Sequence, residues 1–205
     1  MPVEARVSDE ILSADNRLKF ANLDAIPATS GYIFASVTLN STPSDYFLIY
    51  QETTTKRQGQ LMYRQDIEFF TQRSPLADGG RTGNIVYDVL PEGHYALTGW
   101  RSVSGGVGQS SGVFVEPVEF DVKPGVRTYL GSFYFEIASS MGMTVTGTLL
   151  SAEDHHDRDL ALDQKQHPQV STWPVRAVVW EDLPHRIKAS VSGSLSLPLP
   201  IILKH

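Results

Sequence analysis

Short segments of alternating apolar and polar residues recur along this chain, and they limit its fold more than any other feature. In Tyr32–Leu39, every second residue is apolar, namely Ile33, Ala35, Val37 and Leu39. Gly, Pro, Asn, Asp and Ser bound these segments, which is typical of strands separated by turns. About nine or ten such segments follow one another at short spacing. The pattern predicts an all-β fold, a two-layer antiparallel β-sandwich.

One short helix is predicted between the late strands. The segment Asp157–His167 has acidic residues in its first turn and ends with Lys165 and His167, and Pro168 follows directly. This order matches the charge preference of the helix dipole and a typical helix stop. We expect a helical insertion near residues 155–167. Its apolar residues should pack against an edge or open end of a sheet: Leu160 with either Leu162 or Ala161.

The chain has 205 residues, which suits one large all-β domain. Glycine-rich polar stretches at 53–60, 73–84 and 102–112 are expected to be exposed loops of that domain rather than linkers. We therefore expect one sandwich domain over residues 31–205. Residues 1–30 are expected to form an N-terminal segment that packs on it.

Composition excludes several classes of function. The chain has no cysteine, so it can form no disulfide, thiolate zinc site or cysteine nucleophile. Its net charge is −6 and is spread along the chain, which argues against nucleic acid or an anionic membrane surface as a partner. No apolar run approaches the roughly 18 residues that a membrane-spanning helix needs. We expect no transmembrane segment and no cofactor.

Two turns of similar sequence, LPEG at 90–93 and KPGV at 123–126, each precede a strand. Proline fixes φ near about −65° and glycine accepts a left-handed conformation, so each pair is expected to form a hairpin turn. Tyr95 and Tyr129 follow the turns, where a tyrosine can bury its ring and bond a backbone group through its hydroxyl. We expect the following side chains in the apolar interior between the sheets: Tyr95, Leu97, Tyr129 and Phe133.

The turn and strand residues resemble a known family. The motifs are LPxGxYxL at 90–97 and FxVxPGxxxYLG at 120–131. They resemble the transthyretin-like and carboxypeptidase-regulatory-like β-sandwich domains, and most closely their uncharacterised bacterial envelope relatives, which are often lipoproteins. The resemblance covers about Tyr32–Ile137. It implies a prealbumin-like or Ig-like sandwich in the periplasm or cell envelope, with a binding or structural role and no catalytic residues to transfer.

The start of the chain bears on its location. Charged residues interrupt any apolar signal segment there: Glu4, Arg6, Asp9, Glu10 and Asp15. A cytoplasmic location is therefore the alternative to the envelope. A leader ending in a cysteine upstream of Met1 would instead supply a lipid anchor.

Residues 153–163 contain the densest group of potential metal ligands. If the helix begins near Asp154, then His155, Asp159 and Asp163 repeat on one helix face, where they could hold zinc or another divalent ion. The alternative is a polar helix start whose carboxylates cap free N–H groups, and common acidic first turns favour it. A metal-dependent hydrolase built on this cluster is the alternative function.

Two further patterns could indicate an enzyme. Gly108–Gly112 matches the G-x-S-x-G string around Ser110, but a nucleophile elbow needs a helix after it, and here an extended segment follows. Glu119 and Asp121 would lie about 7 Å apart on one strand face, as paired carboxylates can. An exposed loop and a solvated strand face are the favoured interpretations.

Three tryptophans, Trp100, Trp173 and Trp180, lie at expected strand ends or in loops. Such side chains could stack on a sugar or anchor a protein, and they could equally fill the open ends of the sandwich. The sequence therefore predicts a non-catalytic module that binds a protein or glycan partner in the cell envelope through its loops.

Overall fold

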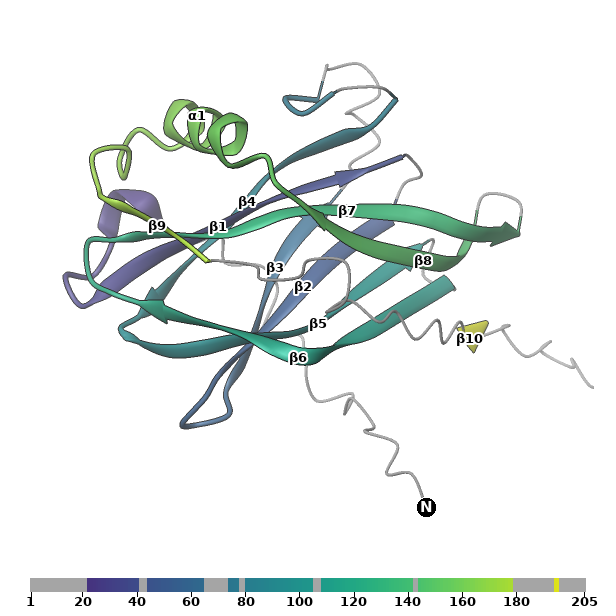
Figure 1. The fold of residues 1–205 in the computed structure, drawn as a ribbon, viewed down its shortest axis with the longest axis horizontal. Helices are drawn as coiled ribbons and strands as arrows, with labels where there is room; N and C mark the ends of the chain where they lie inside the picture. Colours follow the sequence, from purple (N-terminus) through teal and green to yellow (C-terminus); the bar gives the residue numbers. More distant parts are fainter. Residues whose placement is uncertain are drawn as a thin grey trace, which may run out of the picture.

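The fold is that of a computed structural model, which describes residues 22–40, 44–64, 74–77, 80–104, 108–141, 144–178 and 194–195. Two sheets face each other (Figure 1). The first has the order β4-β1-β7-β8, with β9 also paired to β7, and the second has the order β10-β6-β5-β2-β3. The pairings are antiparallel except β1–β7 and β7–β9, which are parallel. The predicted two-layer β-sandwich is confirmed.

The strands of the first sheet are β1 (Ser30–Leu39), β4 (Thr82–Pro91), β7 (Arg127–Met141), β8 (Thr144–Glu153) and β9 (Val175–Ala177). Those of the second sheet are β2 (Ser44–Glu52), β3 (Gln58–Arg64), β5 (Gly93–Ser104), β6 (Gly108–Val122) and β10 (Ser194–Leu195). A short 3-10 helix spans Leu23–Ala25, and α1 spans His156–Gln166. Within the described residues, no helix is both long and apolar enough to cross a membrane.

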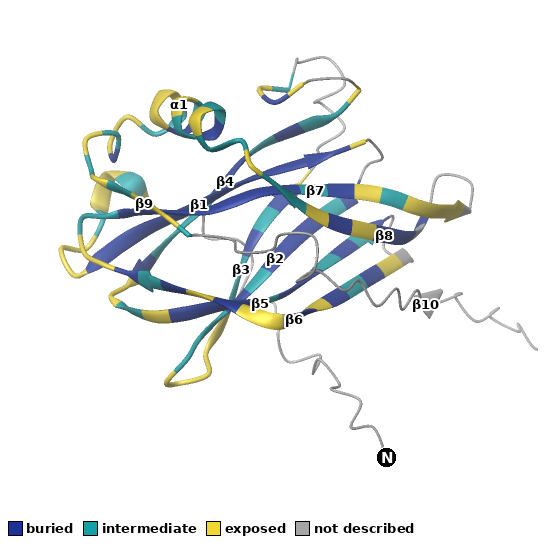
Figure 2. Ribbon diagram, in the orientation of Figure 1, coloured by how far each residue is buried: buried dark blue, intermediate teal, exposed yellow. Residues whose placement is uncertain are grey.

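Strand β1 is buried along its whole length because it lies in the middle of its sheet and is covered on both faces (Figure 2). Its inner face contributes Ile33 and Val37 to the core between the sheets, as the alternation predicts. Its outer face contributes Tyr32 and Phe34 to a second apolar group, here called the outer cluster. The buried members of the outer cluster are Tyr32, Phe34, Ile85, Tyr129 and Val170.

The two proline–glycine turns carry the chain from one sheet to the other, so they are not hairpin turns. The first joins β4 to β5 and the second joins β6 to β7. Gly125 is left-handed, with φ of 67°, as expected, whereas Gly93 begins β5 without a positive φ. The ring of Tyr95 is buried and its hydroxyl donates to the Pro91 carbonyl across 3.0 Å, which confirms that expectation.

Tyr129 corrects one part of the predicted core. Tyr95, Leu97 and Phe133 lie in the core between the sheets, but Tyr129 is buried in the outer cluster. The cause is a bulge in β7, where the register against β1 shifts between Phe34 and Ser36. Gly131 lies at this bulge with φ of 127°. The extra residue places Tyr129 and Phe133 on opposite faces, although simple alternation puts them on the same face.

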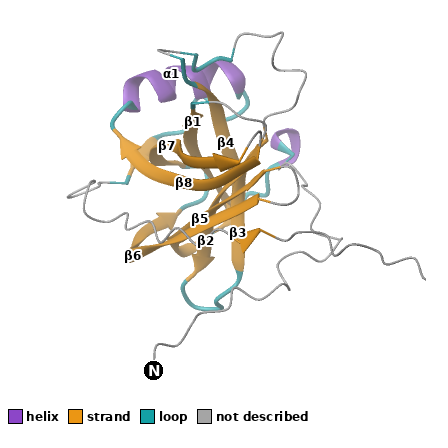
Figure 3. Cartoon of the chain, turned by 90° about the vertical axis from the view of Figure 1, so that its right-hand side faces the viewer, coloured by secondary structure: helices purple, strands orange, loops and turns teal. Residues whose placement is uncertain are grey.

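Helix α1 lies on the outer face of the first sheet, between β8 and β9 in the chain (Figures 1 and 3). Its position agrees with the predicted insertion, and the described residues contain this one α-helix. Leu160 and Leu162 pack against the outer cluster. The helix therefore covers the face of a sheet rather than an edge or open end.

Candidate functional site

The buried face of α1 is acidic. Asp159 and Asp163, one helical turn apart, are its buried residues, and both side chains have no exposed surface. Isolated carboxylates are costly to bury, so each needs hydrogen bonds and a positive partner. The sheet below α1 and the residues flanking it supply both.

Asp163 is held by three elements of the fold. The Tyr32 hydroxyl on β1 donates to its Oδ1 across 2.5 Å, and Arg127 Nη1 on β7 donates to its Oδ2 across 3.2 Å. His167 Nδ1, just after the helix, lies 2.8 Å from Oδ1. Burial, together with the adjacent carboxylate, raises the pKa of Tyr32 above its ordinary value. Tyr32 therefore remains a hydrogen-bond donor.

Asp159 is held in a similar way one turn earlier. Its Oδ2 accepts hydrogen bonds from the Ser36 hydroxyl at 2.5 Å and the Tyr129 hydroxyl at 2.7 Å. Arg158 Nε donates to Oδ1 across 2.9 Å, and its Nη2 lies 3.3 Å from Ser132 Oγ. The bulge at Gly131 lets Tyr129 and Ser132 both face the helix. Without it, the two side chains would point to opposite faces.

Arg127 extends this network to the chain after α1. Its guanidinium is buried and donates to the carbonyls of Trp173 and Ser171, each across 3.1 Å. These bonds fix the segment that leads from the helix into β9. The network therefore sets the position of both ends of α1 relative to the first sheet.

The three predicted metal ligands do not come together. Asp159 and Asp163 are fully occupied in the network under the helix. His155 precedes the helix as its N-cap, with φ of −131° and ψ of 33°, and its Nε2 lies 3.0 Å from Glu153 Oε2. Because the helix begins at His156, His155 lies outside it and does not share a helix face with Asp159 and Asp163. In the described part of the chain, no group of three His, Asp or Glu side chains is arranged to hold a metal ion.

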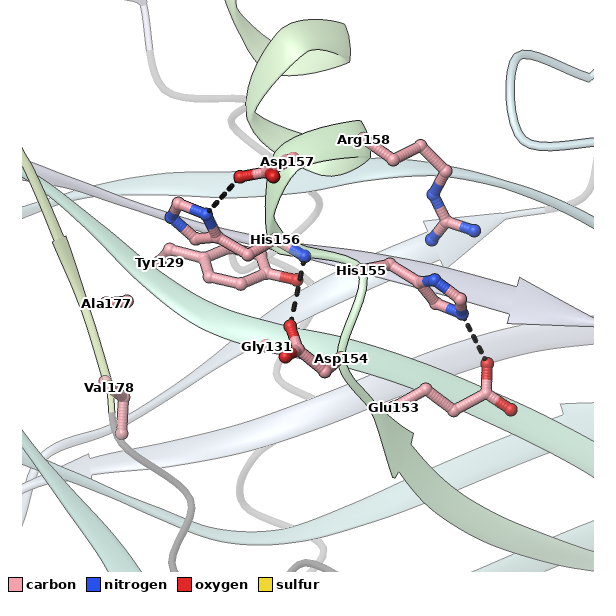
Figure 4. Close-up of a pocket in the computed structure, with 10 residues that line it drawn as sticks. All are labelled: Tyr129, Gly131, Glu153, Asp154, His155, His156, Asp157, Arg158, Ala177 and Val178. Atoms are coloured by element: carbon pink, nitrogen blue, oxygen red, sulfur yellow. Dashed lines mark hydrogen bonds and ion pairs between the residues drawn. The ribbon is translucent and has the colours of Figure 1, made fainter.

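A pocket of about 780 Å³ opens beside the first turn of α1 (Figure 4). Its floor is Tyr129 and Gly131 of β7, and Ala177 and Val178 form one side. The remaining wall is polar and comes from the end of β8 and the start of α1: Glu153, Asp154, His155, His156, Asp157 and Arg158. We call this the helix-start pocket.

The helix-start pocket lies where β7 changes its pairing partner. β9 pairs with β7 up to Tyr129, where the Val178 N–H donates to the Tyr129 carbonyl across 2.9 Å. β8 pairs with β7 from Ser132 onward. Gly131 lies in the interval between the two strands. The pocket floor is thus created by the strand arrangement, and α1 forms its roof.

Hydrogen bonds within the protein orient the polar wall. Glu153 accepts two bonds from Arg81 Nη1, at 2.8 and 2.7 Å, as well as the contact from His155. Burial tends to raise the pKa of Glu153, but the hydrogen bonds from Arg81 and His155 outweigh this and lower it. His156 Nδ1 lies 3.1 Å from Asp157 Oδ1, and its ring meets the Tyr129 ring nearly edge-on at 5.2 Å.

The tryptophans have different environments. Trp100 has no exposed surface and packs edge-on against Phe135 in the core between the sheets, so the idea that it contacts a partner is wrong. Trp173 is half-buried against the outer cluster. Trp180 lies outside the described residues. The indole of Trp100 is accommodated by Gly112, where a Cβ would lie 2.5 Å from the indole nitrogen.

The G-x-S-x-G string is part of a strand rather than a loop. Gly108–Gly112 begins β6, and Ser110 is 1% exposed. Ser102–Ser104 likewise ends β5, so the expectation of an exposed loop over 102–112 is wrong for the described residues. Of the other expected loops, 53–57 forms the connection from β2 to β3.

Glu119 and Asp121 line a second, smaller pocket of about 370 Å³ together with His94 and Arg176. Asp121 contacts His94 Nδ1 at 2.5 Å and Arg176 Nη1 at 2.9 Å. Burial tends to raise the pKa of Asp121, but these two partners lower it overall. The carboxylate is therefore engaged in ion pairs on a solvated strand face, as the sequence indicates.

Comparison with models of known protein families, with curated proteins and with solved structures found no match for this chain. The resemblance carried by the turn motifs therefore stays a prediction.

Sequence reasoning missed the residues that organise this region: Tyr32, Ser36, Arg127 and Arg158. One signal could have found the first two. Tyr32, Phe34 and Ser36 alternate with the apolar inner residues of β1, and large apolar groups on both faces of one strand indicate a second covering layer. No comparable pattern marks Arg127.

Proposed function

We propose that this chain is a non-catalytic binding module of the extracytoplasmic β-sandwich type, and that it binds a polar ligand or partner in the helix-start pocket. The observation that carries the proposal is the fixed polar wall on a rigid apolar floor. A binding site gains affinity when its groups are already held in place, because less conformational freedom is lost on binding. The buried network under α1 provides that rigidity.

Several acidic groups near the pocket are engaged in contacts within the protein, and this favours binding over catalysis. Asp159 and Asp163, which a hydrolase would need for a metal or a proton, instead hold the helix on the sheet. Glu153 is paired with Arg81 and His155. A catalytic acid or base needs a free position facing its substrate. These groups instead support the side chains that line the pocket.

The proposed location in the periplasm or cell envelope rests on the resemblance of the turn motifs alone. Fractionation of source cells, with an antibody against the purified chain, tests it directly. Recovery of the protein in the cytosolic fraction would overturn the location without affecting the binding proposal.

Binding is tested with a ligand-observed NMR screen of small polar molecules: sugars, amino acids, short charged peptides, carboxylates and polyamines. We expect hits that perturb the amide resonances of residues 153–158 and that weaken in His155→Ala. The same mixtures are assayed for turnover with and without a chelator. Turnover of any substrate at this pocket, or hits that all map elsewhere, would overturn the proposal.

A further inference from the structure

We propose that the helix-start pocket binds a neutral carbohydrate segment of one or two sugar rings. This inference rests on the proposed binding function and names its ligand. Small-molecule sites commonly measure about 300–1,000 Å³, and the pocket volume of about 780 Å³ lies within that range. The argument depends on hydrogen-bonding capacity, on the apolar floor and on charge.

Three planar side chains in the wall each use part of their hydrogen-bonding capacity to fix their own position. His155 is held by Glu153, His156 by Asp157, and Arg158 by Asp159 and Ser132. In the part of the chain that the structure describes, His155 Nδ1, His156 Nε2 and Arg158 Nη1 have no protein partner. The pocket therefore presents oriented side chains that each keep a nitrogen available to hydrogen-bond a ligand.

Sugar hydroxyls suit a wall of this composition. A hydroxyl both donates and accepts, a carboxylate accepts only, a guanidinium donates only, and a neutral imidazole does one at each nitrogen. Asp154 and Asp157 supply acceptors beside the donor of Arg158 and the two imidazoles. Planar groups such as these can bridge two adjacent hydroxyls of a sugar ring. A purely donating or purely accepting ligand would leave half of the wall unmatched.

The floor suits the other surface of a sugar. A pyranose ring has C–H groups on its faces, which favour contact with apolar and aromatic groups over water. At one side of the pocket Ala177 and Val178 offer aliphatic surface, and the partly exposed ring of His156, which meets the buried Tyr129 ring edge-on, offers aromatic surface. Gly131 has no side chain, so it leaves space at the base of the pocket.

The charge balance argues against an anionic ligand. Arg81 compensates Glu153, and Arg158 compensates Asp159. The carboxylates of Asp154 and Asp157 then leave the rim negative. A phosphate or acidic polysaccharide would be repelled there. Asp157 is fully exposed, so salt and water weaken both this repulsion and the attraction it would give a cation, and a neutral ligand meets neither effect.

The test uses glucose, galactose, mannose, N-acetylglucosamine and their disaccharides, with saturation-transfer NMR to detect binding and amide shifts to locate it. We expect at least one sugar to bind weakly, with a Kd of about 1 mM, which corresponds to a binding free energy of about −4 kcal/mol. The shifts should include Gly131 and residues 153–158. His155→Ala and Asp157→Ala should each weaken binding by about tenfold, since each removes a hydrogen-bonding group.

His94→Ala is the matched control. His94 is also a surface histidine paired with a carboxylate, Asp121, but it lies in the second pocket. The His94→Ala variant should bind sugar as tightly as the unaltered protein does. Loss of binding in His94→Ala, or binding unaffected by His155→Ala, would overturn the inference by placing the sugar elsewhere.

Two other outcomes separate this inference from the proposed function. If no sugar binds but a lysine-rich peptide shifts residues 153–158 and depends on His155, the ligand class is wrong and the binding function stands. If neither sugars nor the other polar molecules perturb the pocket, both proposals fail. Circular dichroism of each variant confirms that loss of binding does not reflect unfolding.

Discussion

The hydroxyl of Tyr32 donates to Oδ1 of Asp163 across 2.5 Å, although the two residues are 131 positions apart. Both side chains are buried, and the bond joins the central strand of a sheet to the helix that covers it. Helix α1 thus depends on specific hydrogen bonds at positions where most helices bury apolar groups. The predictions below test this attachment and the core beneath it.

Tyr32→Phe keeps the ring and removes the hydroxyl. Asp163 would lose one donor while staying buried, so we expect the free energy of unfolding to fall by about 1–3 kcal/mol. Urea denaturation measures the change. Tyr87→Phe is the matched control, because Tyr87 stacks on Tyr32 and its hydroxyl has no hydrogen-bond partner within the described residues. Equal losses in the two variants would contradict the role given to the Tyr32 hydroxyl.

Arg127 and Asp163 should be strongly coupled. Removing one member of a buried ion pair leaves the other charge uncompensated, which costs about 3–5 kcal/mol. We expect Arg127→Met and Asp163→Leu each to be strongly destabilising. The double variant should be more stable than the sum of the two losses predicts, by about 1–3 kcal/mol. Strictly additive losses in denaturation experiments would show that the pair does not interact.

Gly131→Ala tests the bulge that orients Tyr129 and Ser132. A φ of 127° lies well outside the left-handed helical region that other residues visit, so the substitution should cost about 1–3 kcal/mol. Gly125→Ala is the comparison, because its φ of 67° lies within that region and no atom lies within 4 Å of an added Cβ. The melting temperature should fall further for Gly131→Ala. The reverse order would contradict the account of the bulge.

Ser110 and Ser102 are neighbouring buried hydroxyls in paired strands, with different partners. Ser110 Oγ has no hydrogen-bond partner within the described residues, whereas Ser102 Oγ lies 2.9 Å from Thr148 Oγ1. Ser110→Ala should be neutral or stabilising by up to about 1 kcal/mol, because it removes an unsatisfied polar group. Ser102→Ala should destabilise by about 1–3 kcal/mol, because it leaves the buried Thr148 hydroxyl unpaired. Urea denaturation of both variants measures the difference.

Glu153 should make stability depend on pH in the acid range. Its pKa in the folded protein lies below the ordinary value of 4.5, because the bonds from Arg81 and His155 outweigh burial. The folded state therefore holds this proton less tightly than the unfolded state, so the contribution is complete above pH 4.5 and is lost as the pH falls through the folded pKa.

The corresponding variant is Glu153→Gln. The stability difference between the unaltered protein and this variant should be at most about 1 kcal/mol, because the pair is partly exposed, and should shrink as the medium is acidified. Glu136→Gln, which removes a carboxylate at an exposed position of β7, is the comparison for the substitution itself. A difference that grows on acidification would have the wrong sign and refute the pairing.

Periodicity was enough to predict the sandwich, because the alternation of residues such as Ile33 and Val37 directly reflects a strand with one face in a core. The acidic first turn and Pro168 were enough to locate α1. These are local signals, and local signals determine which elements form.

The face of the sheet on which a given side chain lies could not be predicted from local signals. Tyr129 and Trp100 were assigned from strand alternation and strand ends, but a single-residue bulge and the space left by Gly112 decided where they lie. Asp159 and Asp163 were interpreted as metal ligands or as part of a polar helix start, because their partners, such as Tyr32 and Arg127, are distant in sequence. Nothing local marks a carboxylate whose compensating charge comes from another element.

The central place of β1 has a consequence for synthesis of the chain. β1 is synthesised well before its parallel neighbour β7, which begins at Arg127, whereas β2, β3 and β5 pair within residues 44–104. At translation rates of roughly 5–20 residues per second, one edge of β1 waits several seconds for its neighbour after β4 has emerged. A chain truncated before Arg127 would therefore leave an open, aggregation-prone edge on β1, whereas one that extends through Glu153 contains both β7 and β8.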